Sequence, residues 1–324
     1  MVPTASSFPQ QPDYAGGSLV NLMQSLVLGR GGTAVEPYVP TPLLPAAEVQ
    51  AARHVVLIVL DGLGSHYLAQ HGAQGPLARH LRGQLTTVFP STTAATITTL
   101  VTATAPQQHA VTGWFMYLRE LGTVAAILPF KPRWGSEPFD KSGVAAEGLI
   151  AAPPLFPRLT VSSYFLVPQP LVDSAFSRAA ARGAQRVGYQ GMGGCCQTVS
   201  GLIGASGANR CFIYVYWPEF DALSHKHGNG SAQVLAQFRD IERTFGQLLS
   251  DCAAAAPWSW PSPITASSTP AWPRPCSSPT IPPSRRRWCC RSAASHAPPT
   301  ATCGPTGPET SSTTCRRSSL RSAS

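Results

Sequence analysis

The feature that most constrains the fold is an unbroken apolar run, HVVLIVL, at residues 54–60. A run of this length, rich in β-branched residues, predicts a strand of a parallel sheet that is buried on both faces. The run ends in Asp61, followed by Gly62, Leu63 and Gly64. Because open α/β sheets bind their ligands beyond the carboxyl ends of their strands, Asp61 is a candidate functional residue.

A second run of the same kind, CFIYVYW, occupies residues 211–217 and predicts a second buried strand. The segment DALSHKHG follows it and contains Asp221 and His225. These two side chains are therefore expected at the end of the second strand, as Asp61 is at the end of the first. Residues 231–249 then predict an amphipathic helix, because apolar side chains recur on one face.

A threonine-rich segment, TTVFPSTTAATITTLV, lies between the two strands at residues 86–101. Pro90 disfavours helix directly before itself, and Ser91 or Thr92 could cap a helix that follows. The pattern therefore predicts that Thr93 lies in the first turn of a helix. The free N–H groups and the positive dipole end of that turn favour a bound anion.

Together these residues have the chemistry of a metal-assisted reaction at phosphorus. Asp61, Asp221 and His225 offer oxygen and imidazole ligands, which zinc, manganese and iron all accept. A hydroxyl such as that of Thr93, close to a divalent ion, would have a lowered pKa and could attack phosphorus.

Each of these residues also has an alternative role without catalysis. An aspartate after a strand is often a turn or capping residue, a threonine-rich stretch is often strand or surface, and Asp-x-x-x-His alone is a weak pattern. Cys195 and Cys196 are interpreted as structural residues of a glycine-rich loop, and the GLG after Asp61 is too short for a dinucleotide-binding fingerprint. Five histidines are interpreted as packing or surface residues: His54, His66, His71, His80 and His109.

Composition divides the chain into three regions. Residues 1–52 are expected to form an N-terminal segment that packs on the core, and residues 53–252 an α/β catalytic core. Within that core, about residues 113–190 are rich in aromatic residues, proline and glycine and predict an inserted or covering subdomain. Two further helices are expected, at residues 19–28 and 171–183. Residues 253–324 form a low-complexity tail.

The tail carries most of the net charge of +9, with eight arginines against one acid, Glu309. It contains 13 prolines, 15 serines and one leucine, and no valine, phenylalanine, methionine or tyrosine. Such a segment has too little aliphatic surface to offset the entropy of ordering its backbone, so it is predicted to be disordered. It is either a basic arm that contacts nucleic acid or acidic surfaces, or a stretch translated in the wrong reading frame.

The rest of the composition places the chain among soluble proteins. The N-terminal residues lack the basic and apolar regions of a signal peptide, and no apolar run approaches the roughly 18 residues of a spanning helix. A cytoplasmic protein without membrane partners is therefore expected, and its nine cysteines are expected to be thiols.

In combination the motifs resemble the type I phosphodiesterase/nucleotide pyrophosphatase family of the alkaline phosphatase superfamily. The resemblance spans roughly residues 18–252 and rests on the order of the motifs: strand then LDGLG, FPSTT, TAPQQHAVTG, and strand then DALSHKHG. It implies a mostly parallel sheet with helices on both faces and two metal ions, usually zinc, in one site. Asp61 matches the aspartate of one metal, Asp221 and His225 match ligands of the other, and Thr93 matches the nucleophile.

The implied mechanism is in-line attack by Thr93, a covalent phospho-threonine and release by a metal-activated water. The implied ligand is a small phosphate ester or a nucleotide. The resemblance does not by itself imply a nucleotide substrate. The nucleotide pyrophosphatases of the family often carry asparagine three residues after the nucleophile, where this chain has Thr96. The alternative within the superfamily is a phosphomonoester, phosphonate or sulfate ester as substrate. A non-catalytic product whose basic tail binds nucleic acid is the third reading.

The chain departs from the family in its C-terminal region, where a strand ending in Asp-His-Gly and a further histidine are expected. No aspartate follows Asp251, and His296 lacks matching surroundings. Only four of seven expected metal contacts are present, those of Asp61, Thr93, Asp221 and His225, so impaired activity is expected. A shifted frame would explain this departure. Back-translated and read from the third base, residues 258–266 permit Val-Leu-Ala and then Val-Thr-Asp-His-Gly.

Overall fold

The computed structural model describes residues 11–135 and 137–255 of the 324-residue chain. The chain divides into two units, Met1–Trp272 and Pro273–Ser324, and the described residues all belong to the first. Apart from residues 253–255, the predicted low-complexity tail lies outside the described residues.

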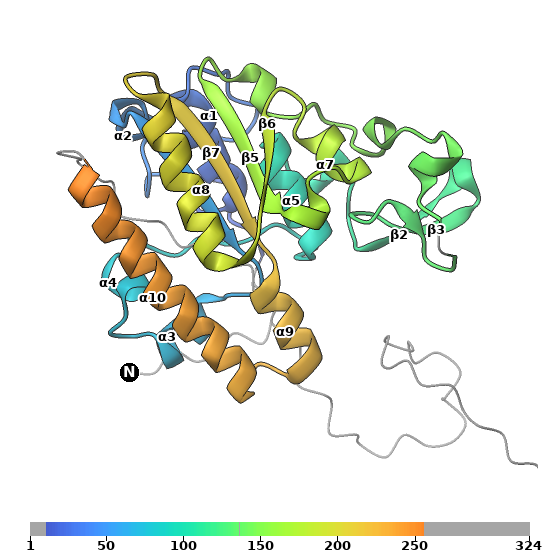
Figure 1. Ribbon diagram of the computed structural model, residues 1–324. Coiled ribbons are helices and arrows are strands. Elements are labelled where there is room, and N and C mark those ends of the chain that lie inside the picture. The colour runs from blue at the N-terminus through green and yellow to red at the C-terminus, as the bar shows by residue number, and fades with distance from the viewer. Residues whose placement is uncertain (1–10, 136, 256–324) are drawn as a thin grey trace, which may run out of the picture. The chain divides into compact units, whose positions relative to one another are not determined.

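The described residues form the predicted α/β fold around a parallel sheet with the strand order β1-β7-β5-β6 (Figure 1). The strands of this sheet are β1 (His54–Leu60), β5 (Ser162–Pro168), β6 (Gln185–Tyr189) and β7 (Cys211–Trp217). The two strands predicted from apolar runs, β1 and β7, have the predicted bounds. They pair in register from His54–Cys211 to Leu60–Trp217, so both end at the same edge of the sheet.

Strands β1 and β7 differ in burial. All seven residues of β7 are buried, as predicted for a central strand. All seven residues of β1 are only half-buried, although full burial was predicted. The reason is position, because β1 lies at the edge of the sheet that the described residues form.

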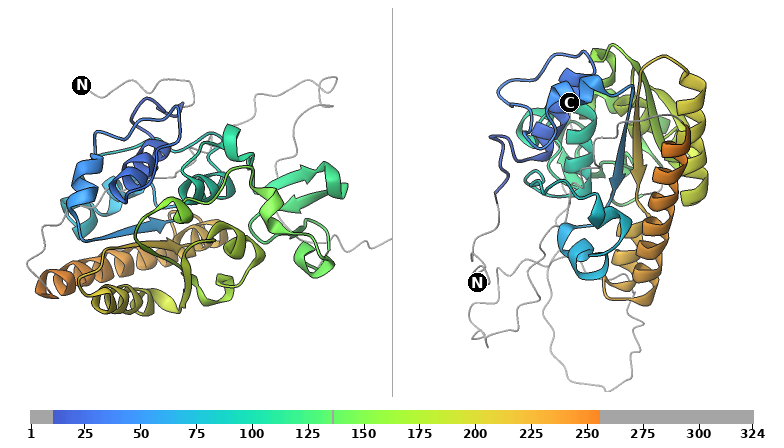
Figure 2. Two further views of the ribbon diagram at one scale, coloured as in Figure 1. Left: turned by 90° about the horizontal axis from the view of Figure 1, so that it is seen from above. Right: turned by 90° about the vertical axis from the view of Figure 1, so that its left-hand side faces the viewer.

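Helices cover both faces of the sheet (Figure 2). Alternate residues of β7 belong to two separate apolar cores. Phe212 and Tyr214 pack with apolar residues of α1 (Leu19–Gly29) and α5 (Thr93–Thr102). Ile213 and Val215 pack with apolar residues of α8 (Gly191–Ser206) and α10 (Ala232–Ala255). The alternation follows from the period of two along a strand.

The α-helices in the described part of the chain have these bounds: α1 (Leu19–Gly29), α2 (Ala46–Ala51), α3 (Ser65–His71), α4 (Pro76–Arg79), α5 (Thr93–Thr102), α6 (Pro106–His109), α7 (Ala175–Ala180), α8 (Gly191–Ser206), α9 (Glu219–His227) and α10 (Ala232–Ala255). Single turns of 3-10 helix are η1 (Arg119–Leu121), η2 (Phe139–Ser142), η3 (Ala146–Leu149), η4 (Phe156–Arg158) and η5 (Gln169–Leu171).

Three helices differ from the sequence-based predictions. Helix α7 is shorter than the predicted helix at residues 171–183, because Ser174 caps its start by accepting a hydrogen bond from the amide of Ser177 at 3.1 Å. Helix α10 runs beyond residue 249 to Ala255. The glycine-rich loop predicted around Cys195 and Cys196 is instead helix α8.

A small antiparallel sheet of order β2-β3-β4 lies apart from the main sheet (Figure 2). Its strands are β2 (Phe115–Leu118), β3 (Thr123–Ala126) and β4 (Lys131–Pro132). The predicted insertion at residues 113–190 also contains β5 and β6, and the structure differs there because these two strands belong to the main sheet.

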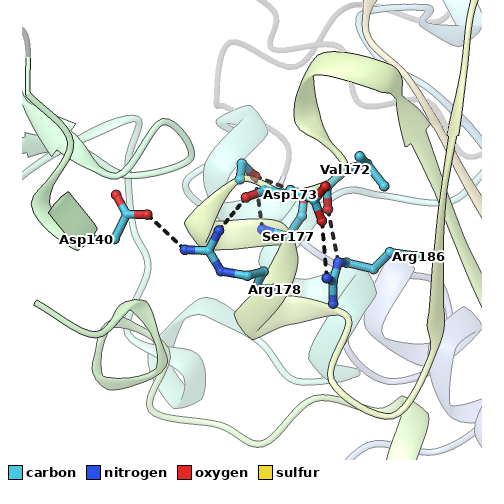
Figure 3. Close-up of polar contacts among 7 residues, drawn as sticks. Asp140, Val172, Asp173, Ser177, Arg178 and Arg186 are labelled. Carbon is cyan, nitrogen blue, oxygen red and sulfur yellow. Dashed lines mark hydrogen bonds and ion pairs between the residues drawn. The ribbon is translucent and has the colours of Figure 1, made fainter. Parts of the chain in front are cut away.

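Arginine contacts tie this region to the main sheet (Figure 3). Arg178 of α7 forms an ion pair with Asp140 of η2 at 2.8 Å and also donates to the carbonyl of Asp173. Arg186 of β6 donates to the carbonyl of Val172 at 3.0 Å and to the carboxylate of Asp173 at 3.3 Å. Helix α7 is thus linked to η2 through Arg178, and the segment directly before it is linked to strand β6 through Arg186.

Among the helices of the described residues, none combines the length and the apolarity that crossing a bilayer requires.

Candidate active site

Asp61 lies directly beyond β1 at the carboxyl edge of the sheet. Its amide donates a hydrogen bond to the carbonyl of Trp217, the last residue of β7, at 3.0 Å. The side chain is 6% exposed, and the hydroxyl of Tyr216 donates to its Oδ2 at 2.8 Å. Two neighbouring strand ends therefore fix both the backbone and the carboxylate of Asp61.

Thr93 is the first residue of α5, as the capping pattern predicted. Thr92 is the cap, and its hydroxyl accepts a hydrogen bond from the amide of Ala95 at 3.4 Å. The hydroxyl of Thr93 lies near enough to the carboxylate of Asp61 to lower its pKa. The helix start thus places a hydroxyl and free backbone amides beside a buried carboxylate.

Asp221 and His225 lie on α9, which begins at Glu219 immediately after β7. They were predicted at a strand end, but the chain turns into a helix there, so they are one helical turn apart. Nε2 of His225 lies 3.4 Å from Oδ2 of Asp221. The imidazole is exposed and Asp221 is half-buried, so the pair opens towards solvent.

The two aspartates approach each other through Gly62. This glycine has a φ of +75°, and a Cβ added to it would lie 2.9 Å from Oδ1 of Asp221. The segments that carry Asp61 and Asp221 therefore lie against each other beyond the carboxyl ends of β1 and β7.

The surroundings of the two carboxylates disfavour their ionised forms. Burial and the nearby charge of Asp221 raise the pKa of Asp61 to about 6, against the lowering effects of the hydrogen bonds from Tyr216, Thr93 and Gly62. Burial also raises the pKa of Asp221, which His225 partly offsets. A cation beside the two carboxylates would favour the ionised forms of both.

The donors fit a divalent cation in kind but supply only part of a ligand set. Two carboxylates and an imidazole are ligands that zinc, manganese and iron accept. Within residues 11–135 and 137–255, however, no three His, Cys, Asp or Glu side chains converge closely enough to hold one ion. The predicted ligands would therefore need further donors to complete either metal site.

Two other residues of the motifs are part of the scaffold. His109 is fully buried, and its Nε2 lies 3.0 Å from Oγ1 of Thr99 while its Nδ1 accepts a hydrogen bond from the amide of Val111 at 3.1 Å. Burial lowers its pKa to about 4, so the ring is neutral and joins α6 to α5. The hydroxyl of Thr96 lies 3.3 Å from that of Thr87.

Tyr216 and Gly62 are the residues of the site to which the motifs assigned no role. Tyr216 is the penultimate residue of the second apolar run, and its hydroxyl is a polar group at the strand end that faces Asp61. Gly62 follows Asp61 directly, and its positive φ allows the close approach of Asp221. The sequence signals were a tyrosine at a strand end and a glycine after a candidate ligand.

Comparison with solved structures gives low overall similarity. Murine ectonucleotide pyrophosphatase/phosphodiesterase 5, as an inactive variant in complex with AMP, matches with 17% identity and a TM-score of 0.45 over 62% of this chain and 52% of that one. The human counterpart matches with 18% identity, the same TM-score and the same coverage. The chain thus spans about half the length of these structures.

Comparison with curated proteins found no match. The profile of the type I phosphodiesterase/nucleotide pyrophosphatase family, by contrast, matches residues 55–255. That range runs from the second residue of β1 to the end of α10 and includes Asp61, Thr93, Asp221 and His225. The chain belongs to the type I phosphodiesterase/nucleotide pyrophosphatase family.

Proposed function

We propose that this chain is built as a metal-dependent hydrolase of phosphoric esters that uses Thr93 as its nucleophile. One observation carries the proposal. Thr93 begins α5 close enough to Asp61 for its hydroxyl to lower the pKa of that carboxylate, whereas the charge of Asp221 raises it. The family match over residues 55–255 supports a reaction at a phosphoric ester.

Asp61, Asp221 and His225 would hold divalent cations, with Zn²⁺ the first candidate for this donor set. Bound cations of this kind lower the pKa of a nearby hydroxyl and neutralise charge on the entering and leaving oxygens. The hydrogen bond from Tyr216 holds Asp61 in place for this role.

The reaction of the chain's own groups has two displacements. The oxygen of Thr93 attacks phosphorus in line, the ester oxygen leaves with a proton, and phosphate stays bonded to Thr93. Water then attacks phosphorus, the bond between phosphorus and the oxygen of Thr93 breaks, the phosphate product leaves with the water oxygen, and Thr93 regains its proton. In both steps the amides of the first turn of α5 face the phosphate oxygens and favour their negative charge.

We propose further that the 324-residue chain is impaired in metal binding and in hydrolysis. Its residues after Asp251 contain no aspartate and one histidine, His296, which lies outside the described residues. The sequence therefore lacks the carboxylate of the Asp-His-Gly motif that the family resemblance implies for the second half of the metal set. The codons possible for residues 261–266 permit that motif in a frame shifted by one base.

The substrate class within phosphoric esters rests on the residue three positions after the nucleophile. Thr96 is buried, and its hydroxyl lies 3.3 Å from the hydroxyl of Thr87. The hydroxyl of Thr96 is therefore engaged by another residue of the fold. This observation keeps a non-nucleotide ester as the second candidate beside a nucleotide.

The test compares the chain as given with a chain whose codons after 253 are read one base out of frame, each loaded with Zn²⁺. The assays use bis(p-nitrophenyl) phosphate, a dinucleotide, p-nitrophenyl phosphate and p-nitrophenyl sulfate. We expect slight turnover by the chain as given and diester hydrolysis by the shifted-frame chain. In that chain Thr93→Ala should lower kcat by at least about 10³-fold, as loss of a nucleophile does.

Thr198→Ala is the matched control, because its hydroxyl bonds within α8 to the carbonyl of Gly194 and not at the site. A shifted-frame chain that binds zinc and hydrolyses none of the four esters would contradict the proposed function. Normal turnover and full zinc loading by the chain as given would contradict the proposed impairment. Coding DNA whose alternative frames near codon 253 lack Asp-His-Gly would remove the frame explanation.

A further inference from the structure

A solvent-open cavity of about 420 Å³ lies at the amino ends of β5 and β7, the edge of the sheet opposite Asp61. Its lining includes Arg30 at the end of α1, Thr160 and Ser162 at the start of β5, and Asn209 and Arg210 before β7. Because the strands are parallel, this cavity is separated from the candidate active site by the length of the sheet.

Two guanidinium groups meet in this cavity. Both Arg30 and Arg210 donate to the carbonyl of Ala52, at 2.8 Å and 2.9 Å. Arg30 also donates to the carbonyl of Arg53 at 3.2 Å and to the carbonyl of Val49. Arg210 also donates to the carbonyl of Gln50. These carbonyls hold both side chains in position, but they carry no full negative charge.

The charge of the pair is left without a carboxylate in the part of the chain that the structure describes. The residues that line the cavity include no aspartate or glutamate. Glu48, on the adjoining helix α2, is engaged by the ion pair with Arg82. Burial and the charge of Arg210 lower the pKa of Arg30 to about 10, which leaves the guanidinium charged at neutral pH.

Arg30 also has unused hydrogen-bonding capacity. It is 1% exposed, and its buried Nε has no hydrogen-bond partner among the described residues. The cavity wall beside it is fixed, because the amide and the hydroxyl of Thr160 donate to the carbonyl of Arg30 at 3.0 Å and 3.1 Å. A buried charge with an unsatisfied donor is costly unless a ligand or partner compensates it.

We propose that this cavity is a second anion site, which binds a phosphate dianion through Arg30 and Arg210 and the polar groups of Ser162 and Asn209. Arginine forks match the geometry of phosphate oxygens, and forks already held in place lose little freedom on binding. The cavity has room for a small phosphomonoester as well as for inorganic phosphate. This site is independent of the proposed hydrolase activity.

The test is equilibrium dialysis of the full chain with radiolabelled inorganic phosphate, and separately with ribose 5-phosphate, in excess chelator. The chelator removes metal-dependent binding at the candidate active site. We expect one phosphate bound per chain with a Kd of about 1 mM or tighter, the scale of two charge-assisted contacts. Tighter binding of ribose 5-phosphate would assign the site to phosphomonoesters, and equal binding to inorganic phosphate.

Arg210→Gln should weaken this binding by about 10-fold or more, and Arg210→Lys by less, because lysine keeps the charge but loses the fork. Arg239→Gln is the matched control, since Arg239 is exposed on α10 outside the cavity lining. Absence of phosphate binding in chelator would overturn the proposal and leave the two arginines as capping groups of α2. Equal binding by Arg210→Gln and Arg239→Gln would overturn it as well.

Discussion

Gly62 and Asp221 are packed against each other so closely that a methyl group on Gly62 would lie 2.9 Å from Cα, Cβ and Oδ1 of Asp221. The first residue follows β1 and the second lies in α9, so this contact sets the separation of the two candidate ligand segments. The positive φ of Gly62 makes the same position unfavourable for any other residue.

Gly62→Ala should therefore push Asp221 away and strain the backbone. We expect the affinity for Zn²⁺ to fall by about 10-fold or more, the scale seen when ligand positioning is lost, and stability to fall by about 1–2 kcal/mol. Isothermal titration with Zn²⁺ and urea unfolding measure the two effects. Gly122→Ala is the control, because Gly122 has a φ of +61° with no atom within 4 Å of an added Cβ. Equal zinc affinity in both variants would contradict a positioning role for Gly62.

Tyr216→Phe removes the hydroxyl that donates to Asp61 at 2.8 Å. Because this hydrogen bond lowers the pKa of Asp61, its loss should raise that pKa further and weaken zinc binding by about 10-fold. Competition with a colorimetric zinc chelator across pH measures the change. Tyr214→Phe is the matched control two residues earlier on β7. The hydroxyl of Tyr214 is buried without a hydrogen-bond partner in the described chain, so its removal should leave zinc affinity unchanged.

Asp61→Asn should alter how the stability of the metal-free protein depends on pH. The pKa of Asp61 is about 6 in the folded state against an ordinary value of 3.8. A raised pKa means that the folded state binds the proton more tightly, so this contribution to stability is complete below about pH 4 and is lost as pH rises through 6. The loss amounts to about 3 kcal/mol at most.

The measurement is urea unfolding in chelator at pH 4.5 and pH 7.5. Relative to the wild type, Asp61→Asn should be more stable at the higher pH than at the lower one. Asp251→Asn, at an exposed position on α10, should show no such change. A wild-type-like pH dependence for Asp61→Asn would contradict the assigned shift.

His109→Ala removes a fully buried ring that joins α6 to α5. We expect a loss of about 3 kcal/mol of stability at pH 7.5, from the cavity and from the unpaired amide of Val111. The folded-state pKa of His109 is about 4, below its ordinary value of 6.5, so its stabilising effect should itself fall as pH drops from 6.5 towards 4. Urea unfolding across that range tests this, with the exposed His80→Ala as the control.

The sequence predicted those elements of the fold whose residue patterns are typical of only one kind of secondary structure. The apolar runs of β1 and β7 gave the correct bounds, and Pro90 with Thr92 predicted where α5 begins. Strand β6 was missed because QRVGY is short and partly polar. Helix α8 was missed because its glycines disfavour helix, whereas packing of Cys195 and Val199 in the second core overrides that preference.

In the candidate site, too, some features could be predicted from the sequence and others could not. That Asp61 and the segment of Asp221 lie at the same edge of the sheet could be predicted, because they follow neighbouring parallel strands. The contact of Tyr216 with Asp61 could not, because it depends on which face of β7 Tyr216 occupies and on how the chain turns at Asp61 after β1. The helical position of Asp221 and His225 was also missed, since the segment after β7 has no apolar period to distinguish a helix from a loop.

The pairing of β1 with β7 has a consequence during protein synthesis. His54 and Cys211, the first pair of the register, are separated by 157 residues. At a ribosomal rate of roughly 5–20 residues per second, the first strand waits for about 8–30 s before its partner has emerged. For that time HVVLIVL is an exposed, uncharged and β-prone segment, the kind of sequence that chaperones protect from aggregation.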